Sequence, residues 1–493
     1  MLTLDYANCL STRVGSHGLD PAVIAKGSEG EAAIAAATAR LTRTKGTGWE
    51  RWRTLPLDPA RTEYTTAVKG VVASVAGKFD TCVVLGIGGS ALGNIAIQSA
   101  LNPSTYNLIN GKDASNPRML TGADLGQSWS GTKHLPRLFV VDNVDPTLFG
   151  SVLDFCARQP GGLKRTLFNV ISKSGETAET AAQFMVIRDA LKHALGPSYA
   201  SNIVAITDPA KGTMRKICDA EKFVTLPVPD GVGGRFSALS PVGLFSAALC
   251  GIDIDALLKG AADMNTVCER SELTRNPAAM LAWLLVELAE HKGKPNHVLM
   301  PYANSLYLLA DWYRQLWAES LGKENDAQGR QVFAGFTPIK ALGTTDQHSQ
   351  IQLYREGPND KVIGFVEVEQ FDRDVTIPRG LGVDALQYLE GSTIGTLLNV
   401  EKRATEFALL ESQRPNFTLR FPRIDAYHVG QFIWLWQMAT AYGGVLLNVD
   451  AYDQPAVELG KQATFGLMGR AGYDHFKTQV DAALVPTLHV IAD

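Results

Sequence analysis

The sequence lacks several features that mark large classes of proteins. None of its apolar runs approaches the ~18 residues of a membrane-spanning helix, and its first residues do not join a basic segment to an apolar one. We therefore expect neither a membrane span nor a signal peptide. The six cysteines are scattered without a Cys-x-x-Cys pair, which argues against a zinc knuckle and a disulfide framework. This usage favours reduced core thiols in a cytoplasmic protein.

An excess of charge of either sign is also missing. Lys plus Arg number 46 and Asp plus Glu number 50, so the net charge is −4. This balance gives no global attraction to nucleic acid or to anionic lipid, and we expect neither as a partner. Any anion site must therefore be local. No tight His/Asp/Glu ligand cluster is visible in the sequence, so we expect no metal and no cofactor.

The pattern along the chain predicts an α/β protein with more than one domain. Its 493 residues exceed one ordinary core, and two or three domains are the expectation. Short continuous apolar runs alternate with helical patterns, which is typical of parallel strands buried on both faces and flanked by helices. The runs that we predict as strands of the first sheet cover residues 81–87, 137–141, 166–171, 202–206 and 223–226.

A second alternation follows a helical stretch. Residues 238–292 are nearly all helical in pattern, and 395–445 mostly so, while strands are predicted at 297–300 and 361–366 with a long helix at 305–321 between them. We expect two doubly wound domains joined by helices. The predicted division is an N-terminal segment 1–60, a first domain 61–230, a helical connection 231–292, a second domain 293–445 and a C-terminal helical segment 446–493.

The segment from Phe168 to Thr180 predicts a phosphate site. A buried strand runs into a loop that offers the hydroxyls of Ser172, Ser174 and Thr177 and the ammonium of Lys173, just before a helix whose N-terminal N–H groups favour anions. The order of a Walker A loop is absent, so a sugar or metabolite phosphate is a better guest than a nucleoside triphosphate. The alternative is a capping box with Ser174 as N-cap.

A glycine-rich turn after residues 81–87 adds a second candidate loop. Gly88, Gly89 and Ser90 follow the strand and precede a helix, so the backbone can approach a ligand closely. The spacing differs from the dinucleotide fingerprint, and no acidic residue stands at a strand end about 20 residues further on. Alone this loop is a weak signal. It gains weight because both loops lie at the carboxyl ends of strands in one sheet.

Two further segments supply a cation and a carboxylate. Arg235 follows two glycines and can present a guanidinium to a developing oxyanion, although a turn arginine exposed to solvent is the alternative. Gln315 and Glu319 are four residues apart on one predicted helix face, next to an apolar stripe. A carboxylate beside a core can act as a general base, and a solvated glutamate is the alternative.

The remaining candidates are a histidine and a lysine. His348 stands in a predicted helix start rich in hydroxyls and amides, where a structural histidine is the alternative. Lys461 follows the stretch Asp453-Gln-Pro and is either a phosphate or hydroxyl contact or a plain surface lysine.

Taken together, these segments resemble the glucose-6-phosphate isomerase family. The matches run in family order from residue 84 to 461 and include Gly86–Gly93, Ser172–Thr177, Asp230–Gly243, Gln315–Ser320, Gln347–Ser349 and Asp453–Lys461. The resemblance implies two flavodoxin-like sugar-isomerase (SIS) domains. It also implies interconversion of glucose 6-phosphate and fructose 6-phosphate, a step of glycolysis and gluconeogenesis, in a homodimer whose active sites lie between subunits.

The resemblance also implies roles for individual residues. Glu319 matches the general base, Arg235 the residue that steadies the enediolate, and His348 the ring-opening residue that comes from the partner subunit. Lys461 is assigned beside it, and Gln315 contacts the sugar. The substrate phosphate is held by Ser90, Ser172, Lys173, Ser174 and Thr177.

Three departures from the family pattern leave this chemistry in place. Ala456 stands where glycine is usual, Leu321 where asparagine is common, and Asp142 where serine is frequent. Two alternatives stay open. One is another SIS-domain enzyme such as an aminosugar-phosphate isomerase. The other is a sugar-phosphate sensor, which would need neither Glu319 nor His348 and would usually carry a basic DNA-binding module that is not visible here.

Overall fold

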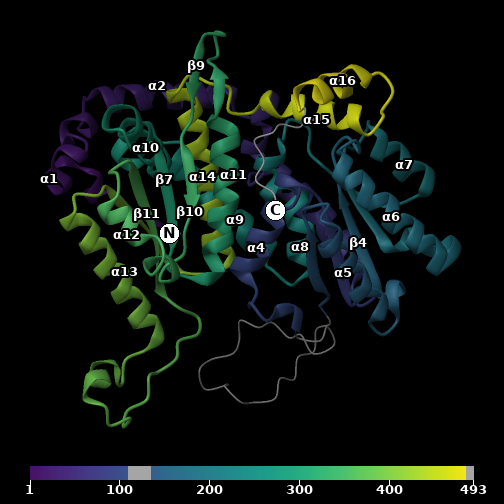
Figure 1. The fold of residues 1–493 in the computed structure, drawn as a ribbon, viewed down its shortest axis with the longest axis horizontal. Coiled ribbons are helices and arrows are strands. Elements are labelled where there is room, and N and C mark those ends of the chain that lie inside the picture. The colour runs from purple at the N-terminus through teal and green to yellow at the C-terminus, as the bar shows by residue number, and fades with distance from the viewer. Residues whose placement is uncertain (109–134, 485–493) are drawn as a thin grey trace, which may run out of the picture. The chain divides into compact units, whose positions relative to one another are not determined.

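The computed structural model describes residues 1–108 and 135–484, which form two compact units, Met1–Asp450 and Ala451–Asp493. Part of the predicted first domain (109–134) and the end of the predicted C-terminal segment (485–493) lie outside the described residues. The first unit contains two five-stranded sheets, each with helices on its faces (Figure 1). The expected α/β class with parallel sheets flanked by helices is confirmed.

The first sheet is wholly parallel and has the order β3-β2-β4-β5-β6. Counted along the chain this is 2-1-3-4-5, the flavodoxin-like order. Its strands are β2 (Thr81–Leu85), β3 (Arg137–Val141), β4 (Thr166–Ile171), β5 (Ile203–Thr207) and β6 (Val224–Pro227). The helices that precede and connect them are α3 (Ala60–Val75), α4 (Leu92–Leu101), α5 (Pro146–Arg158), α6 (Ala178–Leu195) and α7 (Thr213–Glu221). Continuous apolar runs form its central strands because both faces are buried.

The second sheet repeats this order with one exception. Its order is β10-β7-β11-β12-β1, where the first four strands are parallel and β1 pairs antiparallel to β12. The strands are β7 (Asn296–Pro301), β10 (Thr337–Lys340), β11 (Lys361–Gln370), β12 (Asn416–Arg423) and β1 (Thr3–Asp5). The helices around it are α11 (Tyr307–Leu321), α12 (Ile351–Glu356), α13 (Ile394–Glu411) and α14 (Ala426–Leu446).

The sequence-based prediction of this sheet was incomplete. Residues 395–445 were expected to be mostly helical, yet β12 lies between α13 and α14. A short apolar run is ambiguous between strand and helix, and Phe417, Leu419 and Phe421 are buried as in a central strand. β1 is three residues long and becomes a strand only because β12 offers it an edge.

The helical connection holds the two sheets together. It contains α8 (Pro241–Leu249), α9 (Ile254–Cys268) and α10 (Pro277–Lys292), as the sequence predicted. The backbones of α9 and α14 are in contact at two glycines, Gly260 of α9 and Gly430 of α14. A Cβ on Gly260 would fall 1.8 Å from the carbonyl oxygen of Tyr427, and one on Gly430 would fall 1.8 Å from that of Leu257. Glycine is therefore required at both crossings.

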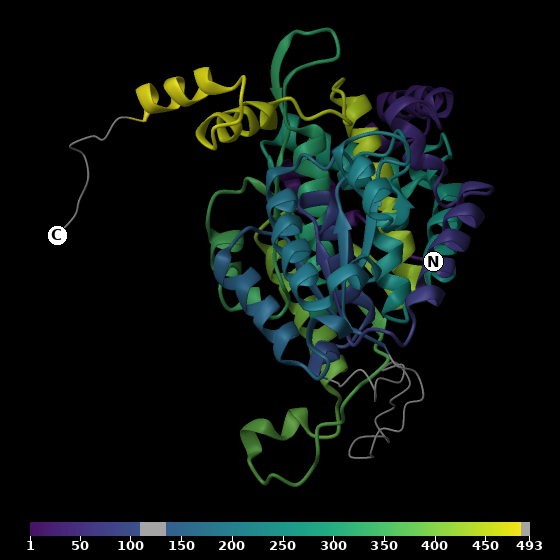
Figure 2. The same cartoon turned by 90° about the vertical axis from the view of Figure 1, so that its right-hand side faces the viewer.

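Two segments project from opposite ends of the second sheet. The hairpin of β8 (Lys323–Asn325) and β9 (Gln331–Ala334) follows α11 and projects at one end (Figure 1). Residues 371–393 follow β11 and project at the opposite end (Figure 2). The N-terminal helices α1 (Ser11–Val14) and α2 (Glu29–Thr44) belong to the same unit. The described part of the C-terminal unit contains α15 (Ala456–Leu467) and α16 (Asp474–Ala483). Among the described residues, none of the helices has the length and apolarity that crossing a bilayer demands.

A buried histidine in β7 predicts a loss of stability in acid. His297 packs against the rings of Trp317 and Phe336, and burial lowers the pKa of its imidazole from 6.5 to about 3. The unfolded chain takes up this proton near pH 6.5, so the stability that the neutral ring provides is complete above that pH and falls as the pH drops toward 3. At pH 5 this single group should cost about 2 kcal/mol of unfolding free energy.

The test is urea unfolding of the native protein and of His297→Leu at pH 7 and pH 5. The variant should lose less stability between the two values than the native protein does. Equal losses would show that His297 is not responsible.

Candidate active site

The two loops predicted from the sequence meet at the switch point of the first sheet. β3 lies on one side of β2 and β4 on the other, so the connections after β2 and β4 leave the sheet in opposite directions. Ligands of such sheets bind in the crevice that this reversal opens at the carboxyl ends of the strands. β2 and β4 are direct neighbours, with Leu85 opposite Val170. The glycine turn (residues 88–90) and the Ser172 loop (residues 172–177) therefore begin side by side.

The Ser172 loop is arranged to present hydroxyl hydrogens. The Oγ of Ser172 accepts a hydrogen bond from the N–H of Gly175 at 3.0 Å, and the Oγ of Ser174 accepts one from the N–H of Glu176 at 3.1 Å. Each hydroxyl also has one hydrogen, which it can donate to an anion. The capping-box alternative for Ser174 is wrong, because α6 begins at Ala178 and Thr177 is its N-cap.

Lys173 lies at the same loop and is fixed through its backbone. Its carbonyl accepts hydrogen bonds from the hydroxyl of Thr207 at 3.2 Å and from the N–H of Asp208 at 3.3 Å. Burial lowers the pKa of its ammonium, while the charges of Asp230 and Asp208 act in the opposite direction. A bound phosphate would add a stronger stabilising charge to this half-buried cation.

Arg235, which follows the first sheet, forms an ion pair with Glu319 of α11, which packs beside the second sheet. Nη1 of Arg235 donates to Oε1 of Glu319 at 3.0 Å, and Nε donates to the hydroxyl of Ser320 at 2.7 Å. The Arg235 side chain is 2% exposed and that of Glu319 is 29% exposed. The guanidinium is thus held rigidly away from water, while the carboxylate keeps partial access to solvent. The exposed-turn alternative for Arg235 is therefore wrong, whereas Glu319 is partly exposed and ion-paired.

Gln315 connects this pair to the glycine turn. Its Nε2 donates to Oε2 of Glu319 at 3.0 Å, as the spacing of four residues on α11 predicted. The same Nε2 atom would lie 3.0 Å from a Cβ built on Gly88, whose φ of +56° also favours glycine. A Cβ on Gly89 would fall 2.1 Å from the carbonyl carbon of Gly234. The glycine turn, the loop that carries Arg235 (residues 230–239, the arginine loop) and α11 are therefore in direct contact.

Aromatic rings support the arginine loop from behind. Arg235 and Phe236 belong to η11 (Gly234–Leu239), and the Phe236 ring stacks on Trp52 with centroids 4.7 Å apart. Trp52 also contacts Trp434 of α14 at 5.3 Å, and the amide of Gln437 donates to the Phe236 carbonyl at 3.1 Å. A buried aromatic cluster thus fixes the backbone that carries Arg235.

Comparison with known proteins identifies the family to which this geometry belongs. The model of the phosphoglucose isomerase family matches residues 62–482. The chain belongs to the phosphoglucose isomerase family. The resemblance predicted from the sequence is thereby confirmed.

Individual relatives agree with this membership. The glucose-6-phosphate isomerase of Carboxydothermus hydrogenoformans is 43% identical over 419 residues, which is 85% of each chain. That of Thermus thermophilus is 38% identical over 384 residues, 78% of this chain and 82% of the relative. A crystal structure of a glucose-6-phosphate isomerase from Chlamydia trachomatis has a TM-score of 0.70 at 25% identity and covers 86% of this chain and 78% of that one. A hypothetical protein from Thermus thermophilus has a TM-score of 0.79 at 34% identity, over 95% of this chain and 100% of that one.

Two residues of the family pattern belong to other parts of the described structure than Glu319 does. They are His348, near the second sheet, and Lys461, in the C-terminal unit. His348 follows β10 at the carboxyl edge of the second sheet, where the neighbouring Gln347 accepts a hydrogen bond from the hydroxyl of Tyr302 at 2.7 Å. α11 starts at that edge and runs back along the sheet for about 22 Å, so Glu319 lies at the amino edge. Lys461 lies on α15 of the C-terminal unit, where its ammonium donates to Glu458 at 2.7 Å.

The three departures from the family pattern occupy ordinary structural positions. Leu321 is the last residue of α11 and is buried, Asp142 directly follows β3, and Ala456 is the first residue of α15.

Sequence reasoning missed one cation of the site. Lys323 is almost buried, and its ammonium donates to the carbonyls of Glu319 and Ser320 at 3.0 and 2.9 Å. A cation at this position complements the negative end of the α11 dipole and holds the turn that carries the carboxylate. The spacing of four residues from Glu319 is the signal that would have indicated it.

A separate cavity lies away from the candidate site. A cavity of about 700 Å³ lies at the opposite end of the unit, between α4 and the carboxyl edge of the second sheet. Its lining includes Gln98, Ser305 and Phe371 and none of the candidate residues. The candidate site is defined by the meeting of its loops, whereas this cavity lies where residues 371–393 leave the sheet.

The contact at Gly89 predicts a matched pair of glycine variants. Gly89→Ala forces the glycine turn away from the arginine loop, so it should cost about 1–3 kcal/mol of stability as an overpacked substitution does. Turnover should fall by up to about 10²-fold, because a displacement near 1 Å is enough to misalign a site. Thermal unfolding and steady-state kinetics measure the two effects.

Gly150 is the control, since it lies in α5 of the same domain and a Cβ there would meet nothing within 4 Å. Gly150→Ala should leave turnover unchanged and stabilise the helix by about 0.5–1 kcal/mol. Equal effects of the two variants would contradict a requirement specific to Gly89.

Proposed function

We infer that this chain interconverts D-glucose 6-phosphate and D-fructose 6-phosphate, a reaction of glycolysis and gluconeogenesis. Family membership supports the reaction, and one structural observation supports the roles that we assign to individual residues. The Glu319 carboxylate is held between the buried guanidinium of Arg235 and the amide of Gln315, next to the loops at the switch point. No cofactor is needed, because the reaction only relocates protons, one from C2 to C1 and one from the C2 hydroxyl to the C1 oxygen, and leaves the overall oxidation state of the sugar unchanged.

In this proposal the Ser172 loop binds the phosphate of the substrate. Ser172, Ser174 and Thr177 donate hydroxyl hydrogens, and Lys173 supplies the charge. Ser90, at the end of η5 (Gly88–Ser90), completes the set from the neighbouring loop. The phosphate does not react and lies far from C1 and C2, so its contacts anchor the inert end of the sugar.

The proton transfer is assigned to Glu319. Its carboxylate removes the proton from C2 of the open aldose and returns it to C1 on the same face of a cis-enediolate, while the hydroxyl proton of O2 passes to O1. Negative charge grows on the substrate oxygen during this step, and a cation that is already fixed stabilises it without reorganisation. Arg235 suits this role because its guanidinium is buried and is held by Glu319 and Ser320 before substrate arrives.

Ring opening is assigned to His348 and Lys461 by the family pattern, and we propose that a homodimer performs it. Within one subunit His348 and Glu319 lie at opposite edges of the second sheet. A His348 donated by the partner subunit to the Glu319 site resolves this separation. We also propose that the protein works in the cytoplasm, since its six cysteines are free, buried thiols.

Replacing the base tests the reaction and its residue together. Glu319→Gln should leave the fold intact and lower turnover by at least about 10²-fold, as expected when an acid–base group is removed. Exchange of the C2 hydrogen of the sugar with solvent, followed by NMR, should fall in parallel. Glu324→Gln is the control, because Glu324 is exposed on β8 only five residues away, and it should remain active. A Glu319→Gln variant with near-native turnover would remove Glu319 from the mechanism.

The shared site predicts complementation between subunits. Glu319→Gln and His348→Ala homodimers should each be nearly inactive. Mixing them under conditions that exchange subunits should restore activity, since a hybrid dimer contains one site with both native residues. Mass spectrometry of the intact dimers checks that exchange has occurred. Hybrids that form without regaining activity would place His348 and Glu319 of one chain in the same site.

A further inference from the structure

An aromatic ring from the N-terminal segment covers the lysine of the Ser172 loop. The ammonium of Lys173 lies 4.7 Å from the centroid of the Trp49 ring. A cation over an indole face is attracted by the quadrupole of the ring, and tryptophan gives the strongest attraction of this kind. Trp49 is 50% exposed, so it is not simply a core side chain. It lies outside every loop that the family pattern indicated.

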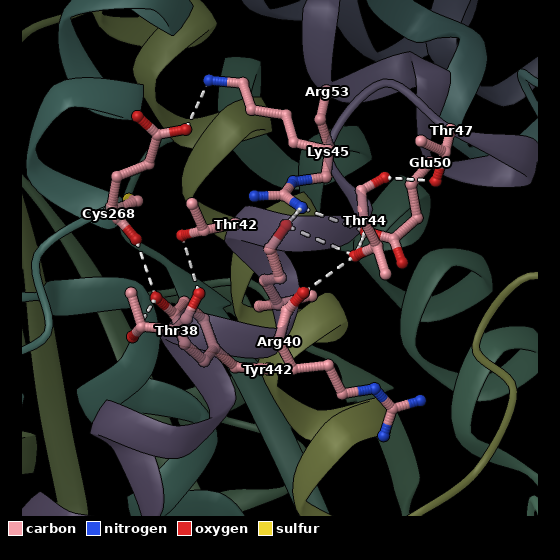
Figure 3. Close-up of polar contacts among 12 residues, drawn as sticks. Thr38, Arg40, Thr42, Thr44, Lys45, Thr47, Glu50, Arg53, Cys268 and Tyr442 are labelled. Carbon is pink, nitrogen blue, oxygen red and sulfur yellow. Dashed lines mark hydrogen bonds and ion pairs between the residues drawn. The ribbon is translucent and has the colours of Figure 1, made fainter.

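Trp49 stands on a short helix with firm support. η4 (Gly48–Thr54) follows α2, and the Glu50 carboxylate accepts hydrogen bonds from Thr44 at 2.8 Å and from Arg53 at 3.0 Å (Figure 3). The guanidinium of Arg53 is buried and also donates to the carbonyl of Leu41. These bonds tie η4 to the end of α2, so the Trp49 ring is carried by a fixed element.

The end of α2 is itself anchored to the helical connection. Lys45 pairs with Glu269 at 2.5 Å, and the hydroxyls of Thr38 and Tyr442 are 2.9 Å apart (Figure 3). Tyr442 belongs to α14 and also donates to the carbonyl of Cys268 at 3.0 Å. The support of Trp49 therefore extends into the helices that join the two sheets.

The same short helix touches the arginine loop. A Cβ on Gly231 would fall 2.1 Å from the carbonyl oxygen of Gly48, and the side chain of Arg51 pairs with Asp230 at 2.5 Å. Trp52, two residues before the end of η4, stacks on Phe236 next to Arg235. η4 thus contacts both the loop that carries Lys173 and the loop that carries Arg235.

We propose that Trp49 is a positioning residue for the phosphate of the substrate, acting through Lys173. The inference rests on the proposed function, in which Lys173 binds that phosphate. The indole face holds the ammonium over the loop before substrate arrives, so that less rotamer freedom of the long lysine side chain is lost on binding. The ring occupies one side of the ammonium, and N–H donors on its other side remain for phosphate oxygens.

The experiment uses two variants of Trp49 in the full-length protein. Trp49→Leu keeps an apolar side chain and removes the aromatic face, while Trp49→Phe keeps a weaker face. KM for glucose 6-phosphate should rise by about three- to tenfold in Trp49→Leu and by less in Trp49→Phe, which reflects the order of cation–π strength. Turnover should stay within about twofold, because a contact present equally in the ground and transition states changes KM alone. Calorimetry with inorganic phosphate should show the same order of affinities.

A double-mutant cycle with Lys173→Met separates positioning from a general structural effect. In the Lys173→Met background, adding Trp49→Leu should cause no further loss of affinity for inorganic phosphate, because the cation is already gone. The same loss in both backgrounds would overturn the proposal in favour of a structural role. Thermal unfolding checks the fold, and Trp49→Phe keeps the test decisive if the leucine variant does not fold.

The outcomes distinguish this inference from the proposed function on which it rests. If Lys173→Met weakens phosphate binding and Trp49→Leu does not, the role of Trp49 is wrong and the phosphate site stands. If Lys173→Met binds inorganic phosphate as tightly as the native protein, the phosphate assignment of the Ser172 loop fails, and the inference about Trp49 fails with it.

Discussion

The geometry of the candidate site depends on the buried guanidinium of Arg235. A charge that leaves water needs a partner in good geometry, and removing the partner of a buried ion typically costs about 3–5 kcal/mol. Glu319 is that partner, and it comes from the other sheet's α11. The pair therefore requires that the arginine loop and α11 dock with atomic accuracy. Gly89 permits the close backbone approach, and Phe236 fixes the loop from behind.

This arrangement also explains why the site lies where it does. The carboxyl edge of the first sheet supplies the Ser172 loop and the glycine turn, while the amino edge of the second sheet supplies the end of α11. Lys323 stabilises that end by donating to the carbonyls of Glu319 and Ser320. The second sheet's own carboxyl edge points away, toward His348. The site is thus assembled from one edge of each sheet, and the His348 of the same chain lies at the other edge of the second sheet.

Much of the fold was predictable because it depends on local pattern. Continuous apolar runs indicated the parallel strands of the first sheet, and the α11 periodicity put Gln315 and Glu319 on one face. β12 was missed because its short apolar run between two long helices does not distinguish strand from helix. β1 was missed because three residues become a strand only when an edge is offered. β10 was not predicted either. The failure at β1 concerns a pairing partner distant in the chain, which no local pattern contains.

The sequence by itself determined which chemical groups the protein has and where strand, turn and helix succeed one another. The hydroxyl loop with its lysine, the glycine turn and the carboxylate of Glu319 were identifiable because their spacing already carries their chemistry. Only the tertiary structure decided that Arg235 is buried against Glu319 and that Trp49 covers Lys173. Those contacts join residues far apart in the chain. Burial and mutual orientation arise when separate elements pack together, so neither can be inferred from the neighbours of a residue in the sequence.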